Sequence, residues 1–259
     1  MALRYELTGN GPNKVLVTHN WMGTIRCYDE VRPYLDDSNF SYAFVDLRGY
    51  GLNKSLEGDY TASESARDLI DVANDLGWTQ FHMVGHSMSG MIALRVCVEA
   101  RSRVKTLVAI TPVTAEGFPL DNAGRELFAA AASGGTEWLT IAGMLTSGRL
   151  PDRWYNAQLQ HFRENVNPAA ALGYMQMFST TNFAAETAGL QLPALAVLGG
   201  HDFMAFCEDE MRQKLGKWLP SLEIEVIESS GHHPMLETPP YFAKVLEKFL
   251  QTNSQSDTI

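Results

Sequence analysis

The chain alternates short apolar segments with longer amphipathic ones, and this rhythm is the strongest constraint on its fold. Segments 14–18, 41–46, 81–84 and 104–110 are rich in β-branched and aromatic residues, as buried strands are. Helical patterns separate these segments, and such crossovers are what parallel strands require. The rhythm predicts an α/β protein with a mostly parallel central sheet covered by helices on both faces.

The segment between Tyr60 and Gly77 carries the clearest helical signal. Thr61 and Glu64 match a capping box, and Gly77 suits a C-terminal stop. A second helix is predicted for 89–100. Apolar residues of the first helix recur at helical spacing and share one face: Ala66, Leu69, Val72, Ala73 and Leu76.

The strand rhythm stops at residue 114 and returns at residue 190. Segment 114–189 is rich in alanine, with interspersed methionine and aromatic residues. We therefore predict a helical cap, 114–189, inserted into a core formed by 1–113 and 190–259.

The second part of the core repeats the earlier pattern. Strands are predicted at 194–198 and 222–227, with a helix at 208–219 between them. A final helix is expected to begin after Pro240, and the polar tail 251–257 to be frayed.

Charge and composition exclude several classes of partner. With 20 Lys and Arg against 30 Asp and Glu, the net charge is −10, which repels phosphate backbones and anionic lipids. No run of about 18 apolar residues is present, and the first residues lack the pattern of a secretory signal. We expect a cytoplasmic monomer or homodimer that binds a small molecule, with no nucleic-acid or membrane partner.

The three cysteines, Cys27, Cys97 and Cys207, are odd in number and far apart. This spacing fits neither a disulfide framework nor a metal-binding pair. We expect free thiols and no metal site.

One serine stands between a predicted strand and a predicted helix. Residues 84–90 read V-G-H-S-M-S-G, so Ser87 lies among small residues that permit a tight turn. Such a turn would lift the hydroxyl above the sheet edge and aim the helix N-terminus at a developing oxyanion. The stretch resembles the G-x-S-x-G nucleophile elbow of the α/β-hydrolase family, with Ser89 in place of the last glycine. The alternative is a serine that only caps a helix.

The resemblance implies a catalytic base near the C-terminus. The family's base follows the last strand in a G-H-x-P loop, which is matched here by Gly231, His232 and Pro234. His232 occupies the family's position and would take the proton of Ser87. The adjacent His233 is its rival.

A carboxylate must hold the base in the correct tautomer. Asp202 follows the strand at 194–198, where the family carries its acid, and the order Ser87, Asp202, His232 is the family's order. Some members carry the acid one strand earlier, but 110–113 contain no carboxylate here.

The family's oxyanion hole consists of two backbone N–H groups. The resemblance assigns them to Met88, which follows the nucleophile, and to Trp21. Residues 18–23, T-H-N-W-M-G, resemble the family's H-G-x-x-G loop, with Asn20 for a glycine. Asparagine tolerates a positive φ, so the turn can form. The Trp21 side chain is expected either to cover the acyl pocket or to pack in the core.

Residues 46–51, D-L-R-G-Y-G, resemble a turn found in many single-domain members of the family. We interpret this turn as structural, with Asp46 and Arg48 available for local pairing. The resemblance then spans residues 14–250.

Flexible methionine and flat aromatic side chains suit an apolar substrate pocket. The alternative is that these side chains only pack the cap against the core. The candidates are Trp21, Met144, Leu145, Trp154, Tyr155, Met175, Met177, Phe178 and His233.

The resemblance implies a serine hydrolase that cleaves a small carboxylic ester or lactone through an acyl-enzyme, with no metal or organic cofactor. One alternative is a cofactor-independent 2,4-dioxygenase acting on a hydroxylated N-heteroaromatic ring, since relatives with that chemistry resemble the loop 19–21. A carbon–carbon bond hydrolase and a binding protein that retains the fold are the others.

Overall fold

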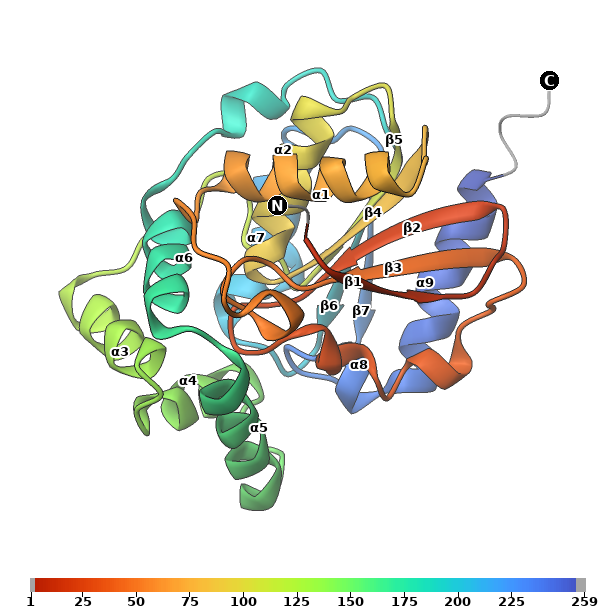
Figure 1. The fold of residues 1–259 in the computed structure, drawn as a ribbon. Helices are drawn as coiled ribbons and strands as arrows, with labels where there is room; N and C mark the ends of the chain where they lie inside the picture. The colour runs from red at the N-terminus through yellow and green to blue at the C-terminus, as the bar shows by residue number, and fades with distance from the viewer. Residues whose placement is uncertain (1–2, 255–259) are drawn as a thin grey trace.

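The computed structural model describes residues 3–254. Its centre is a seven-stranded sheet in the order β1-β3-β2-β4-β5-β6-β7 (Figure 1). All neighbouring strands run parallel except β1 and β3, which are antiparallel. The predicted α/β fold with a mostly parallel sheet is confirmed. The strands are β1 (Tyr5–Thr8), β2 (Asn13–Thr18), β3 (Phe40–Val45), β4 (Phe81–His86), β5 (Val104–Ile110), β6 (Ala194–Gly199) and β7 (Leu222–Ile227).

Helices cover both faces of the sheet (Figure 1). Along β2, Leu16 packs in one apolar cluster, with α1 and α2, while Val15 and Val17 pack in another, with α9. This alternation follows from the two-residue period of a strand and explains why both sets are buried. The core helices are α1 (Ala62–Asp75), α2 (Met88–Glu99), α7 (Glu208–Gly216), α8 (Pro234–Glu237) and α9 (Pro239–Ser254).

Four further helices lie between β5 and β6 and form a layer beside the core, which we call the helical insertion (Figure 1). Its buried residues belong to the same apolar cluster as α1 and α2. The insertion comprises α3 (Asn122–Ala132), α4 (Glu137–Leu145), α5 (Asp152–Asn165) and α6 (Pro168–Thr180).

The start of α1 differs in one detail from the predicted capping box. The Thr61 hydroxyl accepts the N–H of Glu64 at 3.1 Å, as expected. The Glu64 carboxylate, however, accepts the N–H of Tyr60 at 2.8 Å instead of that of Thr61. Tyr60 has a φ of +53°, which turns its N–H toward the helix. Gly77 ends this segment with a φ of +68°.

The C-terminal helix is longer than predicted. Fraying from residue 251 is wrong for 251–254, because α9 continues to Ser254, whose hydroxyl donates to the carbonyl of Leu250 at 2.7 Å. Residues 255–257 of the predicted tail lie outside the described part of the chain.

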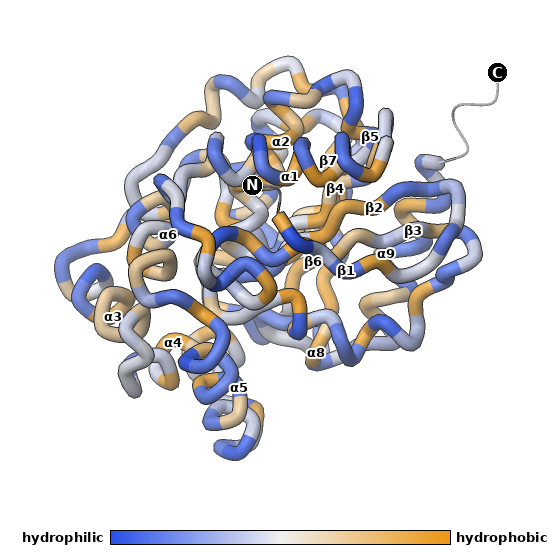
Figure 2. The backbone as a smooth tube through the Cα atoms, in the orientation of Figure 1, coloured by the Kyte–Doolittle hydropathy of each residue, from blue (hydrophilic) through white to orange (hydrophobic). Residues whose placement is uncertain are grey.

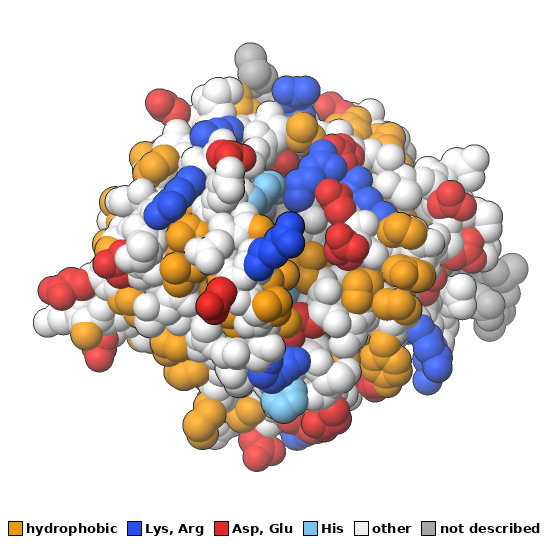
Figure 3. Space-filling view, turned by 90° about the horizontal axis from the view of Figure 1, so that it is seen from below, with side chains coloured by type: hydrophobic (Ala, Val, Ile, Leu, Met, Phe, Trp, Pro, Cys, Tyr) orange, Lys and Arg blue, Asp and Glu red, His pale blue; other side chains and the backbone are white. Residues whose placement is uncertain are grey.

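The hydropathy of the residues differs between the inner sheet and the outer parts of the molecule. Apolar stretches run along the strands, and polar residues mark the outer turns and the exposed side of the insertion (Figure 2). Basic, acidic and apolar side chains intermingle on the face seen from below (Figure 3). Among residues 3–254, none of the helices has the length and apolar character to cross a bilayer.

Candidate active site

Ser87 stands at the junction where β4 ends and α2 begins. Its backbone has φ +55° and ψ −117°, a conformation that costs energy for any residue with a Cβ and is typical of functional sites. Two glycines make the junction possible. A Cβ at Gly85 would lie 2.2 Å from the carbonyl oxygen of Ser89, and one at Gly90 would lie 2.4 Å from Pro112. The crowding falls on Gly85 and Gly90, so serine is tolerated at position 89.

A continuous hydrogen-bond chain joins the three predicted polar residues. Ser87 Oγ lies 2.8 Å from His232 Nε2, and His232 Nδ1 lies 2.7 Å from Asp202 Oδ2. The side chains of His232 and Asp202 are each 1% exposed. Because a carboxylate only accepts, Nδ1 carries the proton, and Nε2 is left to accept from the Ser87 hydroxyl.

His233, the rival base, points elsewhere. Its ring packs against Trp154 and His86, with centroids 5.8 Å and 5.4 Å away. Burial holds the pKa of its imidazole well below the usual value. It borders a separate cavity of about 120 Å³, together with Asn20 and His161. The structure therefore brings His232, and not His233, to the serine.

The backbone carbonyl of His232 is hydrogen-bonded by two residues that lie at the ends of β4 and β5. His86 Nε2 lies 2.8 Å from its carbonyl oxygen, and the Thr111 hydroxyl donates to the same oxygen at 3.1 Å. The Asn20 amide lies 3.2 Å from His86 Nδ1, so Nδ1 accepts and Nε2 donates. Burial lowers the pKa of His86 well below the usual value, which keeps this ring neutral. Thr111 adopts a φ of +39° where it leaves β5.

The loop after β2 places Trp21 near Met88, so the two predicted oxyanion donors border one cavity beside Ser87. Neither backbone N–H donates a hydrogen bond within residues 3–254. Asn20 does not adopt the positive φ expected at this position. Its side chain instead accepts the N–H of Met22 at 2.7 Å, which closes the turn. The Ser89 hydroxyl donates a hydrogen bond to the carbonyl of His19.

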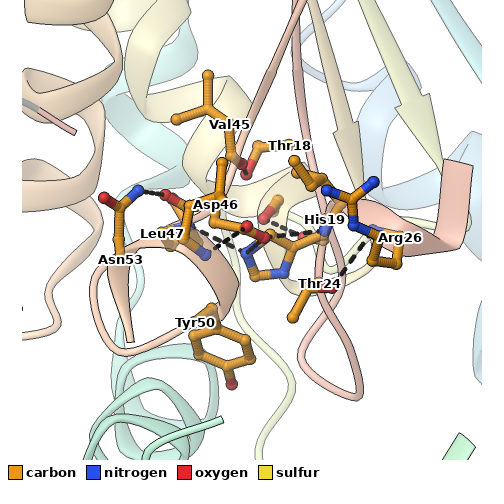
Figure 4. A network of polar contacts seen from close by, with 12 residues as sticks. Thr18, His19, Thr24, Arg26, Val45, Asp46, Leu47, Tyr50 and Asn53 are labelled. Carbon is orange, nitrogen blue, oxygen red and sulfur yellow. Dashed lines mark hydrogen bonds and ion pairs between the residues drawn. The ribbon is translucent and has the colours of Figure 1, made fainter. Parts of the chain in front are cut away.

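His19 anchors this loop to the sheet (Figure 4). Its Nε2 accepts the N–H of Leu47 at 3.0 Å, and its Nδ1 donates to the carbonyl of Asn20 at 2.7 Å. Burial lowers the pKa of His19, which favours the neutral ring that these bonds need. Asp46 accepts the N–H of Ile25 at 2.9 Å. This network holds the loop in a fixed place beside the elbow.

The turn at 46–51 has the structural role predicted for it, with different partners. The Asp46 carboxylate accepts hydrogen bonds from backbone N–H groups, including that of Leu52 at 2.9 Å. Arg48 forms a paired contact with Asp68 of α1, at 2.6 Å and 2.7 Å. A Cβ at Gly51 would lie 2.1 Å from the Asp46 carboxylate, which explains the glycine.

The cavity above Ser87 has a volume of about 70 Å³. Ser87 and His232 supply its polar side chains, and the rest of the wall is apolar or aromatic. Four predicted residues border it: Trp21, Met144, Leu145 and Phe178. Sequence reasoning missed seven others: Met22, Val113, Phe118, Phe128, Ile141, Phe203 and Phe206.

Five predicted pocket residues are absent from this wall. Met177 is 5% exposed and packs in the core. Trp154 and Tyr155 pack against each other in α5. Met175 is likewise in the core, and His233 borders the second cavity.

The structure also bears on metal and thiol chemistry. Cys27 and Cys97 are buried free thiols, and Cys207 is an exposed one. Within the described residues, no group of three or more His, Cys, Asp or Glu side chains is arranged to hold a metal ion.

A family model described as the alpha/beta hydrolase family matches residues 15–245. The chain belongs to the α/β-hydrolase family. The resemblance seen in the sequence is therefore confirmed, and relatives of this α/β hydrolase include enzymes of several reaction types.

Two relatives are similar over nearly their whole length. A Bacillus subtilis (strain 168) protein, provisionally named a 2-succinyl-6-hydroxy-2,4-cyclohexadiene-1-carboxylate synthase, is 26% identical over 96% of this chain and 95% of its own. The pimeloyl-acyl-carrier-protein methyl ester esterase of Nitrosomonas europaea is 25% identical over 95% and 98%. The enol-lactonase from Burkholderia xenovorans LB400 shares the fold, with a TM-score of 0.83 at 18% identity and 96% coverage of both chains.

Proposed function

We propose that this α/β hydrolase is a serine hydrolase that cleaves small carboxylic esters or lactones with a short, apolar acyl portion. The observation that carries the proposal is the hydrogen-bond chain from Ser87 through His232 to Asp202 at the base of an apolar cavity. A serine needs an adjacent base to become nucleophilic. Here His232 is that base, and its hydrogen bond to Asp202 defines its tautomer.

Acylation begins when Ser87 Oγ attacks the substrate carbonyl carbon and its proton passes to His232 Nε2. The resulting imidazolium is stabilised by Asp202. The free N–H groups of Trp21 and Met88 are the donors for the tetrahedral oxyanion. When the intermediate collapses, the carbon–oxygen bond breaks, and His232 returns the proton to the leaving alkoxide.

Deacylation repeats these steps with water. His232 Nε2 accepts a proton from water as its oxygen attacks the acyl carbon, and the same proton returns to Ser87 Oγ when the ester bond to the enzyme breaks. The products are a carboxylic acid and the alcohol released earlier. For a lactone both groups remain in one molecule.

The cavity supports a short acyl group. Its volume of about 70 Å³ is roughly half that of an engineered protein cavity, of about 150 Å³, that binds benzene. An apolar wall favours a carbon chain over a charged group, because an unpaired buried charge is costly. The names of two similar proteins, a methyl ester esterase and an enol-lactonase, lie in the same reaction class.

The test is a panel of p-nitrophenyl esters of increasing acyl length and simple lactones, assayed with wild type and Ser87→Ala. We expect turnover that falls as the acyl chain lengthens, and loss of turnover in Ser87→Ala with an unchanged circular dichroism spectrum. Full activity in Ser87→Ala would contradict the proposal. It would favour direct attack by water on the substrate, with His232 as the general base.

A further inference from the structure

One turn of the helical insertion contacts both loops that carry the base and the acid. This turn, residues 145–149, joins α4 to α5. The carbonyl of Leu145 accepts the backbone N–H of His232 at 3.0 Å. The Ser147 hydroxyl donates to the carbonyl of His201 at 2.8 Å, and His201 directly precedes Asp202. The turn therefore fixes the backbone at His232 and next to Asp202.

A buried carboxylate completes the contact. Glu237 of α8 is 3% exposed, and its two oxygens accept the N–H groups of Gly231 at 2.8 Å and His233 at 3.1 Å. These are the two neighbours of His232. Such a carboxylate requires a counter-charge, and Arg149 supplies it at 3.2 Å.

Arg149 reaches the same loop a second time. Its Nη2 donates to the carbonyl of Ser229 at 2.9 Å. The arginine thus bridges α8 and the segment before His232 from the side of the insertion. Both contacts use the guanidinium fork, which a single ammonium group reproduces only in part.

The fit between the turn and the histidine loop is close. A Cβ at Gly231 would lie 2.9 Å from the carbonyl oxygen of Leu145 and 3.1 Å from the Cα of Thr146. Ser147 adopts a φ of +51°, an uncommon conformation that tertiary contacts must maintain. The Thr146 hydroxyl lies 2.5 Å from the Tyr155 hydroxyl, which ties the turn to α5. The turn is thus held from both sides.

Leu145 has two roles in this arrangement. Its side chain borders the cavity, and its carbonyl holds His232. Leu145 therefore connects the cavity wall to the backbone of His232.

We propose that Arg149 is a positioning residue for His232, acting through Glu237 and through the contacts of the 145–149 turn with the histidine loop. The inference rests on the proposed function, since aligning His232 matters only if that ring is the base.

The test compares Arg149→Ala and Arg149→Lys with wild type, using p-nitrophenyl acetate and the rate of labelling by a fluorophosphonate. Arg149→Ala is expected to lower kcat and the labelling rate by about tenfold to 100-fold, with little change in KM. For Arg149→Lys, kcat and the labelling rate should lie between those of wild type and Arg149→Ala. Guanidinium ion at low concentration should restore part of the activity of Arg149→Ala, while sodium chloride at equal ionic strength should not.

Arg95→Ala is the matched control. Arg95 pairs with Glu186 at 2.7 Å on another part of the surface, so this substitution also breaks an arginine–glutamate pair. It should leave kcat unchanged and show no response to guanidinium.

The outcomes separate the two proposals. Wild type that takes no label would contradict the proposed function itself. Labelled wild type with an equally fast Arg149→Ala would overturn the positioning role. A slow Arg149→Ala that guanidinium does not restore would overturn it as well, because a general loss of structure would then explain the effect.

Discussion

The hydroxyl of Ser89 donates a hydrogen bond to the backbone carbonyl of His19, 70 residues away in the sequence. Trp21 lies two residues after His19, and Met88 directly precedes Ser89. The bond therefore joins the two segments whose N–H groups are the proposed oxyanion donors. A glycine, the usual residue of the motif at position 89, has no side chain to form it. This departure from the motif fixes the distance between the elbow and the loop.

Ser89→Ala tests that role. Without the hydroxyl, the buried carbonyl of His19 loses its partner, at a cost of about 1–3 kcal/mol, and the Trp21 segment is free to shift. We expect kcat for p-nitrophenyl acetate to fall about tenfold with little change in KM. Ser41→Ala removes a buried hydroxyl bonded to the carbonyl of Gly11 at the other end of the sheet and should leave kcat unchanged. Equal kcat values for the two variants would argue against the role of Ser89.

Asp202→Asn tests the acid. The amide would present an N–H to His232 Nδ1 or favour the wrong tautomer, so Nε2 could no longer accept the proton of Ser87. We expect kcat to fall by about 1,000-fold to 10,000-fold, with the melting temperature nearly unchanged. Asp209→Asn, an exposed aspartate of α7, is the control. A loss of less than about tenfold in Asp202→Asn would contradict the assignment.

Phe128→Ala tests the shape of the cavity. Phe128 borders it and packs against Trp21, with ring centroids 5.2 Å apart. Removing the ring should enlarge the cavity and shift the preferred p-nitrophenyl ester toward longer acyl chains. Met177→Ala removes a buried side chain that is absent from the wall, and should lower stability without a shift in preference. The same shift in both variants would show that the cavity does not set chain length.

Buried histidines predict how stability depends on pH. Burial lowers the pKa of His19, His86 and His233, so these rings stay neutral in the fold. In the unfolded chain each takes up a proton near pH 6.5. The unfolded state then binds more protons, so their stabilising contribution is complete above about pH 6.5 and is lost below it, by about 1.4 kcal/mol per pH unit for each ring.

Urea unfolding at pH 7.5 and pH 5.5 measures this loss. In His233→Phe one of the three rings no longer titrates, so this variant should lose about 1 kcal/mol less than wild type between these pH values. His233 Nδ1 has no hydrogen-bond partner among the described residues, so phenylalanine breaks no bond there. Identical losses in the two proteins would contradict the neutral state of His233.

Local patterns were enough to predict most of the fold. Six strands lie within one or two residues of their predicted bounds, because each has an apolar or an alternating pattern bounded by turns. β1 was missed: its residues Tyr5–Thr8 lie at the sheet edge and are only partly buried, so no hydrophobic pattern distinguishes them. The end of α9 was placed too early because its last turn is polar.

Motif order was enough to predict which residues meet at the site, and the match of Gly231, His232 and Pro234 to the family loop favoured His232 over His233. The sequence alone could not fix the direction of each ring, because that depends on packing against distant segments, such as Asp202 for His232 and Trp154 for His233. The cavity wall was predicted in part for the same reason. Phe118 and Phe128 reach it only through the packing of the insertion, which no local pattern encodes.

Intact-mass analysis after treatment with a fluorophosphonate tests whether Ser87 is an activated nucleophile, because this reagent reacts covalently with an activated serine. We expect one adduct on wild type, none on Ser87→Ala, and strongly slowed labelling of His232→Ala. No adduct on folded wild type, or an adduct that persists in Ser87→Ala, would contradict this assignment.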